Sequence, residues 1–284
     1  METFESFDFT SKCGEKLTAI KMVPKTPVAA IVLIHGMGEH AARYAHWAER
    51  FKNHGIAWYS FDLPGHGRST GKRGHFRSMP WIMNIIREFE TTVKKEVKAA
   101  PMILYGHSMG GNLVLNYLLR NTHQFKLGIV TSPWIRLVHP PSPAMIQLAD
   151  LMHLIYPGFT QSSGLKAEDM SSQHEECSLY EKDPLNHKKI SANSFHLIHH
   201  GGQFIEKNIH QLSIPVLLTH SDKDPLTLYS ATESLQKGNS ELIQFLRFEK
   251  GKHELHNDSS RDELFAAEIQ FIQSKLHDRV QDKA

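Results

Sequence analysis

Short apolar runs, each followed by a stretch with helical spacing, constrain the fold of this chain most. The first clear run, VAAIVLI at 28–34, contains no polar residue and ends at His-Gly, which is typical of a strand buried on both faces of a parallel sheet. The later runs stand at 56–62, 101–106, 126–132, 214–220 and 241–248. Because parallel strands need crossover connections, this alternation predicts an α/β fold with a mostly parallel central sheet and helices on both faces.

The remaining patterns divide the chain into a core and an insertion. FESFDFT and KLTAIKMV, within the first 23 residues, predict an antiparallel pair joined by Lys12–Gly14. Helical patterns fall at 41–54, 80–99, 109–120, 229–237 and 261–276. The alternation stops after 132 and resumes with the run at 214–220. We therefore predict a core made of 1–132 and 211–284, with 133–210 inserted as a cap above the carboxyl edge of the sheet, where such folds hold their sites.

Composition excludes several classes of protein. The chain has 284 residues, of which 40% are hydrophobic, which is enough for a substantial core. With 32 Lys+Arg against 30 Asp+Glu, the charge is too balanced to favour nucleic acid as a partner. The apolar runs are too short to span a bilayer, and METFESFDFT lacks the pattern of a secretory signal. Cys13 and Cys177 form no metal or redox motif. We expect a cytoplasmic protein, with peripheral membrane contact left open and no oligomeric state implied.

One serine stands where a nucleophile is expected. Gly106-His107-Ser108-Met109-Gly110 fits the pattern G-x-S-x-G between an apolar strand and an apolar helix, which is the context of a nucleophile elbow. Ser69 lies in a second match to the pattern, but loops flank it on both sides. We predict Ser108 as a nucleophile and Ser69 as a turn or N-cap residue.

A serine nucleophile needs a base, and the base needs an orienting acid. In this kind of fold the acid and then the histidine follow the serine along the chain. Asp222 and Asp224 both follow the 214–220 run, and we favour Asp224, because Ser221 then takes the Gly place of a Gly-x-x-Asp pattern. His253 follows the last run, and His256 is its rival.

An oxyanion hole requires two backbone N–H donors. Met109 directly follows Ser108 at the start of a predicted helix, whose dipole favours negative charge. The loop 35–39 after the first buried run offers Met37 as the second donor.

These motifs together resemble the monoacylglycerol lipase and lysophospholipase branch of the α/β-hydrolases. The matching stretches are HGMGEHAARY (35–44), FDLPGHGRSTGKRGHF (61–76), GHSMGG (106–111), YEKDPL (180–185), HSDKDPLT (220–227) and HELH (253–256). The resemblance implies that the segment corresponding to 133–210 is a cap with apolar surface that touches membranes and admits an acyl chain. Two departures are Met37, in place of a smaller residue, and Ser221, in place of Gly.

The resemblance also implies a polar pocket for a glycerol-like leaving group, lined by Glu39, Arg43 and His256. An alternative for Glu39 and Arg43 is a structural ion pair at a helix start. Within the cap, nine of the twelve residues Met145–Tyr156 are apolar, so a helix there is buried, lines a tunnel or lies on a membrane.

The histidines do not amount to a metal site at the level of the sequence. His196, His199 and His200 could place two imidazoles on one helix face, but no carboxylate or cysteine cluster accompanies them. HELH lacks one residue of the zinc-binding pattern H-E-x-x-H. We therefore expect neither a metal nor a cofactor.

The chain is thus expected to be a serine esterase that cleaves single-chain lipid esters, with monoacylglycerol as the first substrate. Lysophospholipid is the runner-up, because Arg43, Lys72 and Arg73 could bind a phosphate. An aminopeptidase is a third possibility. A binding protein without turnover is disfavoured, because all three triad candidates are present.

Overall fold

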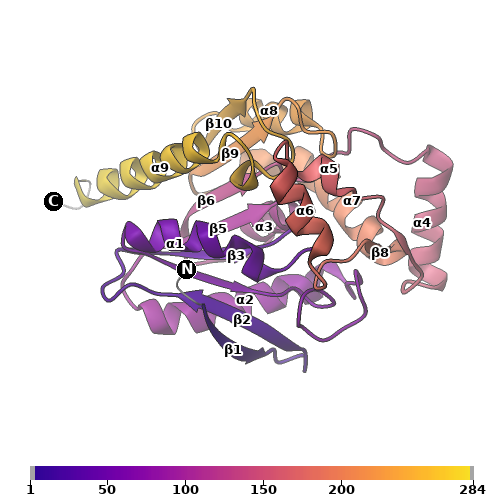
Figure 1. The fold of residues 1–284 in the computed structure, drawn as a ribbon, viewed down its shortest axis with the longest axis horizontal. Helices are drawn as coiled ribbons and strands as arrows, with labels where there is room; N and C mark the ends of the chain where they lie inside the picture. The colour runs from indigo at the N-terminus through magenta and orange to yellow at the C-terminus, as the bar shows by residue number, and fades with distance from the viewer. Residues whose placement is uncertain (1–3, 282–284) are drawn as a thin grey trace.

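The computed structural model describes residues 4–281 and is built around one eight-stranded sheet with the order β1-β2-β4-β3-β5-β6-β9-β10 (Figure 1). The strands are β1 (Glu5–Thr10), β2 (Lys16–Met22), β3 (Ala29–Ile34), β4 (Ile56–Phe61), β5 (Met102–His107), β6 (Phe125–Thr131), β9 (Val216–Ser221) and β10 (Ile243–Phe248). β2 runs antiparallel to both β1 and β4, and the other pairs are parallel. The predicted antiparallel pair and the mostly parallel sheet are confirmed.

Helices cover both faces of the sheet. The 3-10 turn η1 (Ala41–Tyr44) leads into α1 (Ala45–Asn53), which lies on one face with α9 (Arg261–Gln281). The other face carries α2 (Met79–Val97), α3 (Met109–Arg120) and α8 (Tyr229–Gly238). β3 shows why a strand covered on both sides is apolar throughout: Ala30, Val32 and Ile34 enter the core on one side, and Ala29, Ile31 and Leu33 enter the core on the other.

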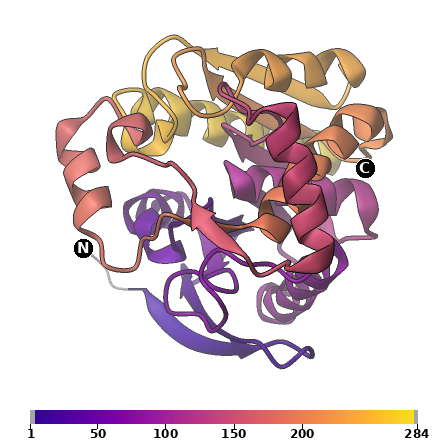
Figure 2. The same cartoon turned by 90° about the vertical axis from the view of Figure 1, so that its right-hand side faces the viewer.

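The segment between β6 and β9 forms a separate group of elements. It contains α4 (Pro143–Ile155), β7 (Thr160–Ser162), α5 (Ala167–Met170), α6 (His174–Lys182), β8 (Lys189–Ser191), α7 (Ala192–Asn208) and η2 (Ile209–Gln211). β7 and β8 pair antiparallel in a small sheet of their own. Figure 2 looks onto this end of the molecule, with α4 in the foreground. The boundaries at 133 and 210 stay predictions, and residues 1–3 and 282–284 of the expected core lie outside the described residues.

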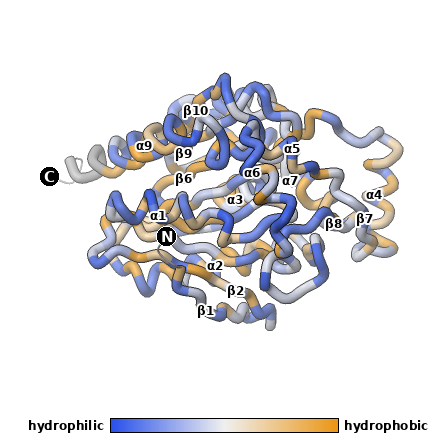
Figure 3. Tube along the Cα trace, in the orientation of Figure 1, coloured by the Kyte–Doolittle hydropathy of each residue, from blue (hydrophilic) through white to orange (hydrophobic). Residues whose placement is uncertain are grey.

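α4 is the helix that the sequence predicts to be buried, to line a tunnel or to lie on a membrane. Ser142 caps it by accepting a hydrogen bond from the Met145 N–H. The helix packs on α7, yet all of its residues are at least partly exposed, and Leu154 and Ile155 are 76% and 70% exposed. Figure 3 shows its apolar residues at the outer end of the molecule. Among residues 4–281, no helix combines the length and the apolar character needed to cross a membrane.

Candidate active site

Ser108 occupies a sharp turn between β5, which ends at His107, and α3, which begins at Met109. Its backbone lies at φ 55°, in the region that side chains other than glycine seldom adopt. The flanking glycines allow this geometry. A Cβ on Gly106 would lie 2.6 Å from the Gly110 carbonyl oxygen, and a Cβ on Gly110 would lie 2.0 Å from the Ile34 carbonyl oxygen. The turn is therefore a nucleophile elbow, which presents the serine hydroxyl at the carboxyl edge of the sheet.

His253 and Asp224 meet Ser108 from two later loops. His253 Nε2 lies 2.8 Å from Ser108 Oγ, and His253 Nδ1 lies 2.8 Å from Asp224 Oδ2. All three side chains are buried. The rival acid Asp222 instead pairs with Arg247, at 2.6 Å between Oδ2 and Nη2. The structure thus brings together the three residues favoured from the sequence.

Asp224 accepts more hydrogen bonds than the one from His253. Its Oδ1 accepts the N–H groups of Leu226 and Thr227, and its Oδ2 also accepts the Thr227 hydroxyl, at 2.7 Å. His220 Nε2 lies 2.9 Å from the same Oδ2. Although burial favours the neutral acid, the two histidines hold the pKa of Asp224 well below its usual range.

The same electrostatics act on His253. Burial disfavours its imidazolium form, but the charge and hydrogen bond of Asp224 outweigh this effect and raise the pKa of His253.

His220 and Thr227 are missing from the expected site residues. The signal for His220 was its place four residues before Asp224, at the end of a buried strand, where a side chain can reach the following loop.

The loop that follows β3 passes directly beside Ser108. A Cβ on Gly36 would lie 3.2 Å from the Ser108 Cβ, and Met37 lines the cavity above. The Gly36 N–H donates to Glu39 Oε1 at 2.6 Å, which fixes the loop. Met109 is the first residue of α3, so its N–H is among the amides that have no partner within the helix. Both candidate oxyanion donors thus belong to segments that adjoin Ser108.

Two of the expected head-group residues belong to a buried ion-pair network. Arg43 binds Glu254 through two hydrogen bonds of 2.6 and 2.7 Å and binds Glu39 Oε2 at 2.9 Å. Burial raises the pKa of Glu39, whereas Arg43 overcomes burial at Glu254 and holds the pKa of that carboxyl far below its usual range. The network connects the loop that carries His253 with the loop beside Ser108. Glu254 is a member of the network that sequence reasoning missed.

His256 lies beneath Tyr44, with the two ring centroids 4.6 Å apart. Burial lowers the pKa of His256 to about 3, so its ring is neutral at pH 7. Both ring nitrogens are buried without a hydrogen-bond partner among the residues that the structure describes. Within residues 4–281, the cavity wall includes Glu39 but neither Arg43 nor His256.

A cavity of about 530 Å³ opens above Ser108. Much of its wall comes from the segment between β6 and β9, including Met145 and Ala149 of α4. The large apolar side chains that line it are Met37, Trp134, Leu137, Met145, Leu165, Met170, Ile190, Phe195 and Leu226. Such a site suits a ligand that is mainly apolar.

The contacts of several histidines could not be read from the sequence. His253 and His256 of HELH point to different surroundings, one to Ser108 and the other to Tyr44. His196 and His200 of α7, in contrast, lie against Asp150 of α4. Asp150 is far from them in sequence, so no local pattern could have indicated this contact.

The fold and this site define the class of protein. A mostly parallel sheet of eight strands, a serine at a nucleophile elbow and a histidine and an aspartate from the loops after β10 and β9 make this chain an α/β-hydrolase with a serine hydrolase site. The profile of the family described as "Serine aminopeptidase, S33" matches residues 25–260. The chain belongs to this family.

Individual proteins show the same likeness. An uncharacterized abhydrolase domain-containing protein of Dictyostelium discoideum is 30% identical over 266 residues, which make up 92% of this chain but only 28% of that protein. A monoacylglycerol lipase of Mycolicibacterium smegmatis is 31% identical over 226 residues, or 79% of this chain and 80% of that protein. The crystal structure of Paleococcus ferrophilus monoacylglycerol lipase matches with a TM-score of 0.84 and 28% identity, over 91% of this chain and 99% of that chain. These likenesses extend across most of the chain.

Proposed function

We propose that this chain is a serine esterase that cleaves monoacylglycerol to a fatty acid and glycerol, with Ser108, His253 and Asp224 as its catalytic residues. The observation that carries the proposal is the unbroken series of hydrogen bonds from Ser108 through His253 to Asp224, at the base of a mainly apolar cavity. The monoacylglycerol lipases among its relatives support the choice of substrate.

Each half of the reaction uses His253 twice. Ser108 Oγ attacks the ester carbonyl carbon while His253 Nε2 takes the hydroxyl proton. The N–H groups of Met37 and Met109 hold the oxyanion that forms. The bond to the glycerol oxygen then breaks, and His253 returns the proton to the departing glycerol. In the second half, His253 takes a proton from water while the water oxygen attacks the acyl-serine carbonyl carbon. The bond between the acyl carbon and Ser108 Oγ then breaks, His253 returns the proton to Oγ, and the fatty acid leaves.

The electrostatics of the triad suit this role. His253 must be neutral to accept the serine proton and must then carry charge beside Asp224. Because Asp224 is ionised and fixed by Leu226, Thr227 and His220, it stabilises that charge without having to move.

The charges around the cavity favour glycerol over a phosphate-bearing head group. Arg43 is already shared by two carboxylates, Lys72 Nζ is bound to the Gly158 carbonyl, and Arg73 is bound to the Gly67 carbonyl. Lys166 is a cation that does line the cavity, and Asp169 lines it too. We infer that Glu39 meets the glycerol hydroxyls, and that Arg43 and His256 support the wall from behind.

We further propose that residues 133–210 form a cap and that α4 meets a lipid surface. Leu148, Leu151, Leu154 and Ile155 on this helix are all about half exposed or more. Single-chain lipids reside in membranes, and exposed apolar side chains next to a lipid-sized cavity give them a route into it.

The first experiment compares fatty-acid release from mono-oleoylglycerol and oleoyl-lysophosphatidylcholine, with Ser108→Ala as the blank. We expect faster cleavage of the glycerol ester and no activity in the variant. Faster cleavage of the lysophospholipid would replace the head-group assignment. Absence of cleavage above the blank would refute the hypothesis of a lipid substrate. Hydrolysis of an alanyl amide would then test the alternative hypothesis of an aminopeptidase.

The membrane contact is tested by co-sedimentation with phosphatidylcholine vesicles. The double variant Leu154→Asp/Ile155→Asp should lose vesicle binding. Leu179→Asp is the matched control, because Leu179 is 61% exposed on α6. Equal binding by the wild type and both variants would remove α4 from the proposal.

A further inference from the structure

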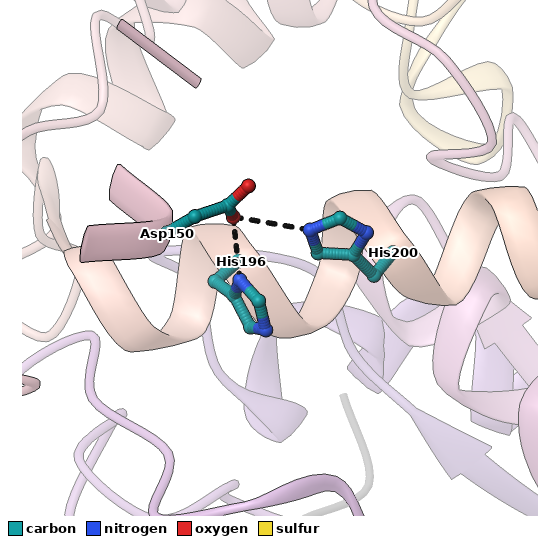
Figure 4. A group of neighbouring side chains, drawn as sticks. All are labelled: Asp150, His196 and His200. Atoms are coloured by element: carbon teal, nitrogen blue, oxygen red, sulfur yellow. Dashed lines mark hydrogen bonds and ion pairs between the residues drawn. The ribbon is translucent and has the colours of Figure 1, made fainter. Parts of the chain in front are cut away.

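A carboxylate of α4 and two imidazoles of α7 converge between these two helices (Figure 4). Asp150 Oδ1 lies 2.6 Å from His196 Nδ1 and 3.0 Å from His200 Nε2. His196 and His200 are one helical turn apart, so their side chains leave α7 on the same side. Within the described part of the chain, none of these three residues lines the cavity above Ser108, so the cluster lies outside the proposed hydrolytic site.

The three donor atoms match the requirements of a divalent transition metal. Two imidazole nitrogens and one carboxylate oxygen are ligands that Zn²⁺ prefers, and water often takes the fourth position. The three atoms all lie within 4.8 Å of one another. Bonds of about 2.0–2.2 Å in a tetrahedral site require ligands about 3.4 Å apart, so small side-chain rotations suffice. The side chains of Asp150, His196 and His200 are 39%, 23% and 40% exposed, which leaves an ion a path from solution.

The hydrogen-bond partners of His200 point in the same direction. Its Nε2 faces the Asp150 carboxylate, and its Nδ1 lies 3.1 Å from Gln203 Oε1. Both neighbours are hydrogen-bond acceptors, but a neutral imidazole has only one N–H to donate. An ion on Nε2 would leave the N–H on Nδ1 for Gln203, which is the usual arrangement of a metal-bound histidine and its outer partner.

The surroundings restrict the other ring. His153 of α4 stacks on His196, with centroids 4.0 Å apart and an angle of 6° between the planes. This stack limits rotation of the His196 ring, whose Nδ1 faces the Asp150 carboxylate.

We propose that Asp150, His196 and His200 bind a divalent transition metal ion, for which Zn²⁺ is the reference, and that this ion ties α4 to α7. On binding, the proton on each ligating nitrogen passes to solvent or to the other nitrogen of the same ring. Because α4 supplies Met145 and Ala149 to the cavity wall, the ion would also fix that wall. The proposal does not depend on which ester the chain cleaves.

The test uses the full chain without a polyhistidine tag. Zn²⁺ binding is measured by calorimetry, and Co²⁺ binding by its visible absorption, for the wild type, His196→Ala, His200→Ala and Asp150→Asn. The matched control is His174→Ala/His210→Ala, which removes two exposed imidazoles elsewhere. We expect one ion per wild-type chain and tetrahedral Co²⁺ absorption, with affinity at least about tenfold weaker in each ligand variant and unchanged in the control.

Thermal unfolding supplies a second readout. Zn²⁺ should raise the Tm of the wild type and of the control, but not that of His196→Ala/His200→Ala. Equal Zn²⁺ affinity in the wild type and the ligand variants, or binding that never saturates near one ion per chain, would overturn the proposal.

Discussion

The positive φ of Ser108 leads to a testable prediction about the stability of two variants. In the middle of a helix or strand, a protein with glycine is less stable than one with alanine by about 0.5–1 kcal/mol, because glycine loses more conformational freedom on folding. At φ 55° the Cβ of alanine is strained, and such strain costs about 1–3 kcal/mol. We therefore expect Ser108→Gly to be more stable than Ser108→Ala by about 0.5–2 kcal/mol. Both variants lack the hydroxyl, so both should be inactive.

The difference is large enough to measure. At about 2.1 cal/mol/K per residue, a chain of 284 residues has an unfolding entropy of about 0.6 kcal/mol/K, so the expected difference in Tm is about 1–3 °C. Equilibrium unfolding in urea gives the same quantity as a shift in midpoint at constant slope.

Ser234 provides the control, because it is exposed in the middle of α8. There Ser234→Gly should be less stable than Ser234→Ala by about 1 kcal/mol. If the order at Ser108 is the same as at Ser234, the backbone at the elbow is not strained and the reasoning is refuted.

Three further predictions concern charge. Since His253 must be neutral to accept a proton and its pKa is raised, kcat/KM should fall with decreasing pH through a midpoint above 6.5; a midpoint below 6.5 would contradict the role given to its ion pair. Arg43→Met leaves two glutamates buried without a counter-charge, so the free energy of unfolding, measured in urea, should fall by about 3–5 kcal/mol. Arg50→Met breaks an exposed ion pair and should lower it by at most about 1 kcal/mol. Similar losses in the two variants would argue against the buried network. Burial raises the pKa of Glu268 to about 8. Between pH 4.5 and 8 the folded state therefore holds a proton that the unfolded state releases. The free energy of unfolding should decrease by about 1.4 kcal/mol for each pH unit as the pH rises through this range. Glu268→Gln should abolish most of that slope, and an unchanged slope would rule out Glu268 as its source.

The centre of the sheet was predictable because β3, β4, β5 and β9 are buried on both faces. A run such as 28–34 has no polar side, and few environments other than a parallel sheet covered by helices accommodate it. The place of Ser108 followed from the same logic, because a strand, a turn with glycines and a helix are all local patterns. The order of acid and histidine then followed from the order of the strands.

Contacts between distant segments were not predictable in the same way. Arg43 could be read as a ligand for substrate, because the sequence does not show that Glu254 lies across from it. Asp150 stood in a helix judged by its apolar residues, so its contact with His196 and His200 was invisible. Side chains that meet across elements depend on packing angles, which no periodicity encodes.

Because of the order of the strands along the chain, the catalytic residues are synthesised at different times. Ser108 follows β5, whereas Asp224 and His253 follow β9 and β10, and β9 enters the sheet by pairing with β6 from Gly128↔Val216 to Thr131↔Thr219. During synthesis on the ribosome, the nucleophile therefore emerges long before its base, and we expect the nascent chain to be inactive until β9 and β10 have docked. Cutting the chain between β6 and β9 should give two inactive fragments, and recovery of activity on mixing them would report on the docking of the two parts, which includes the β6–β9 pair.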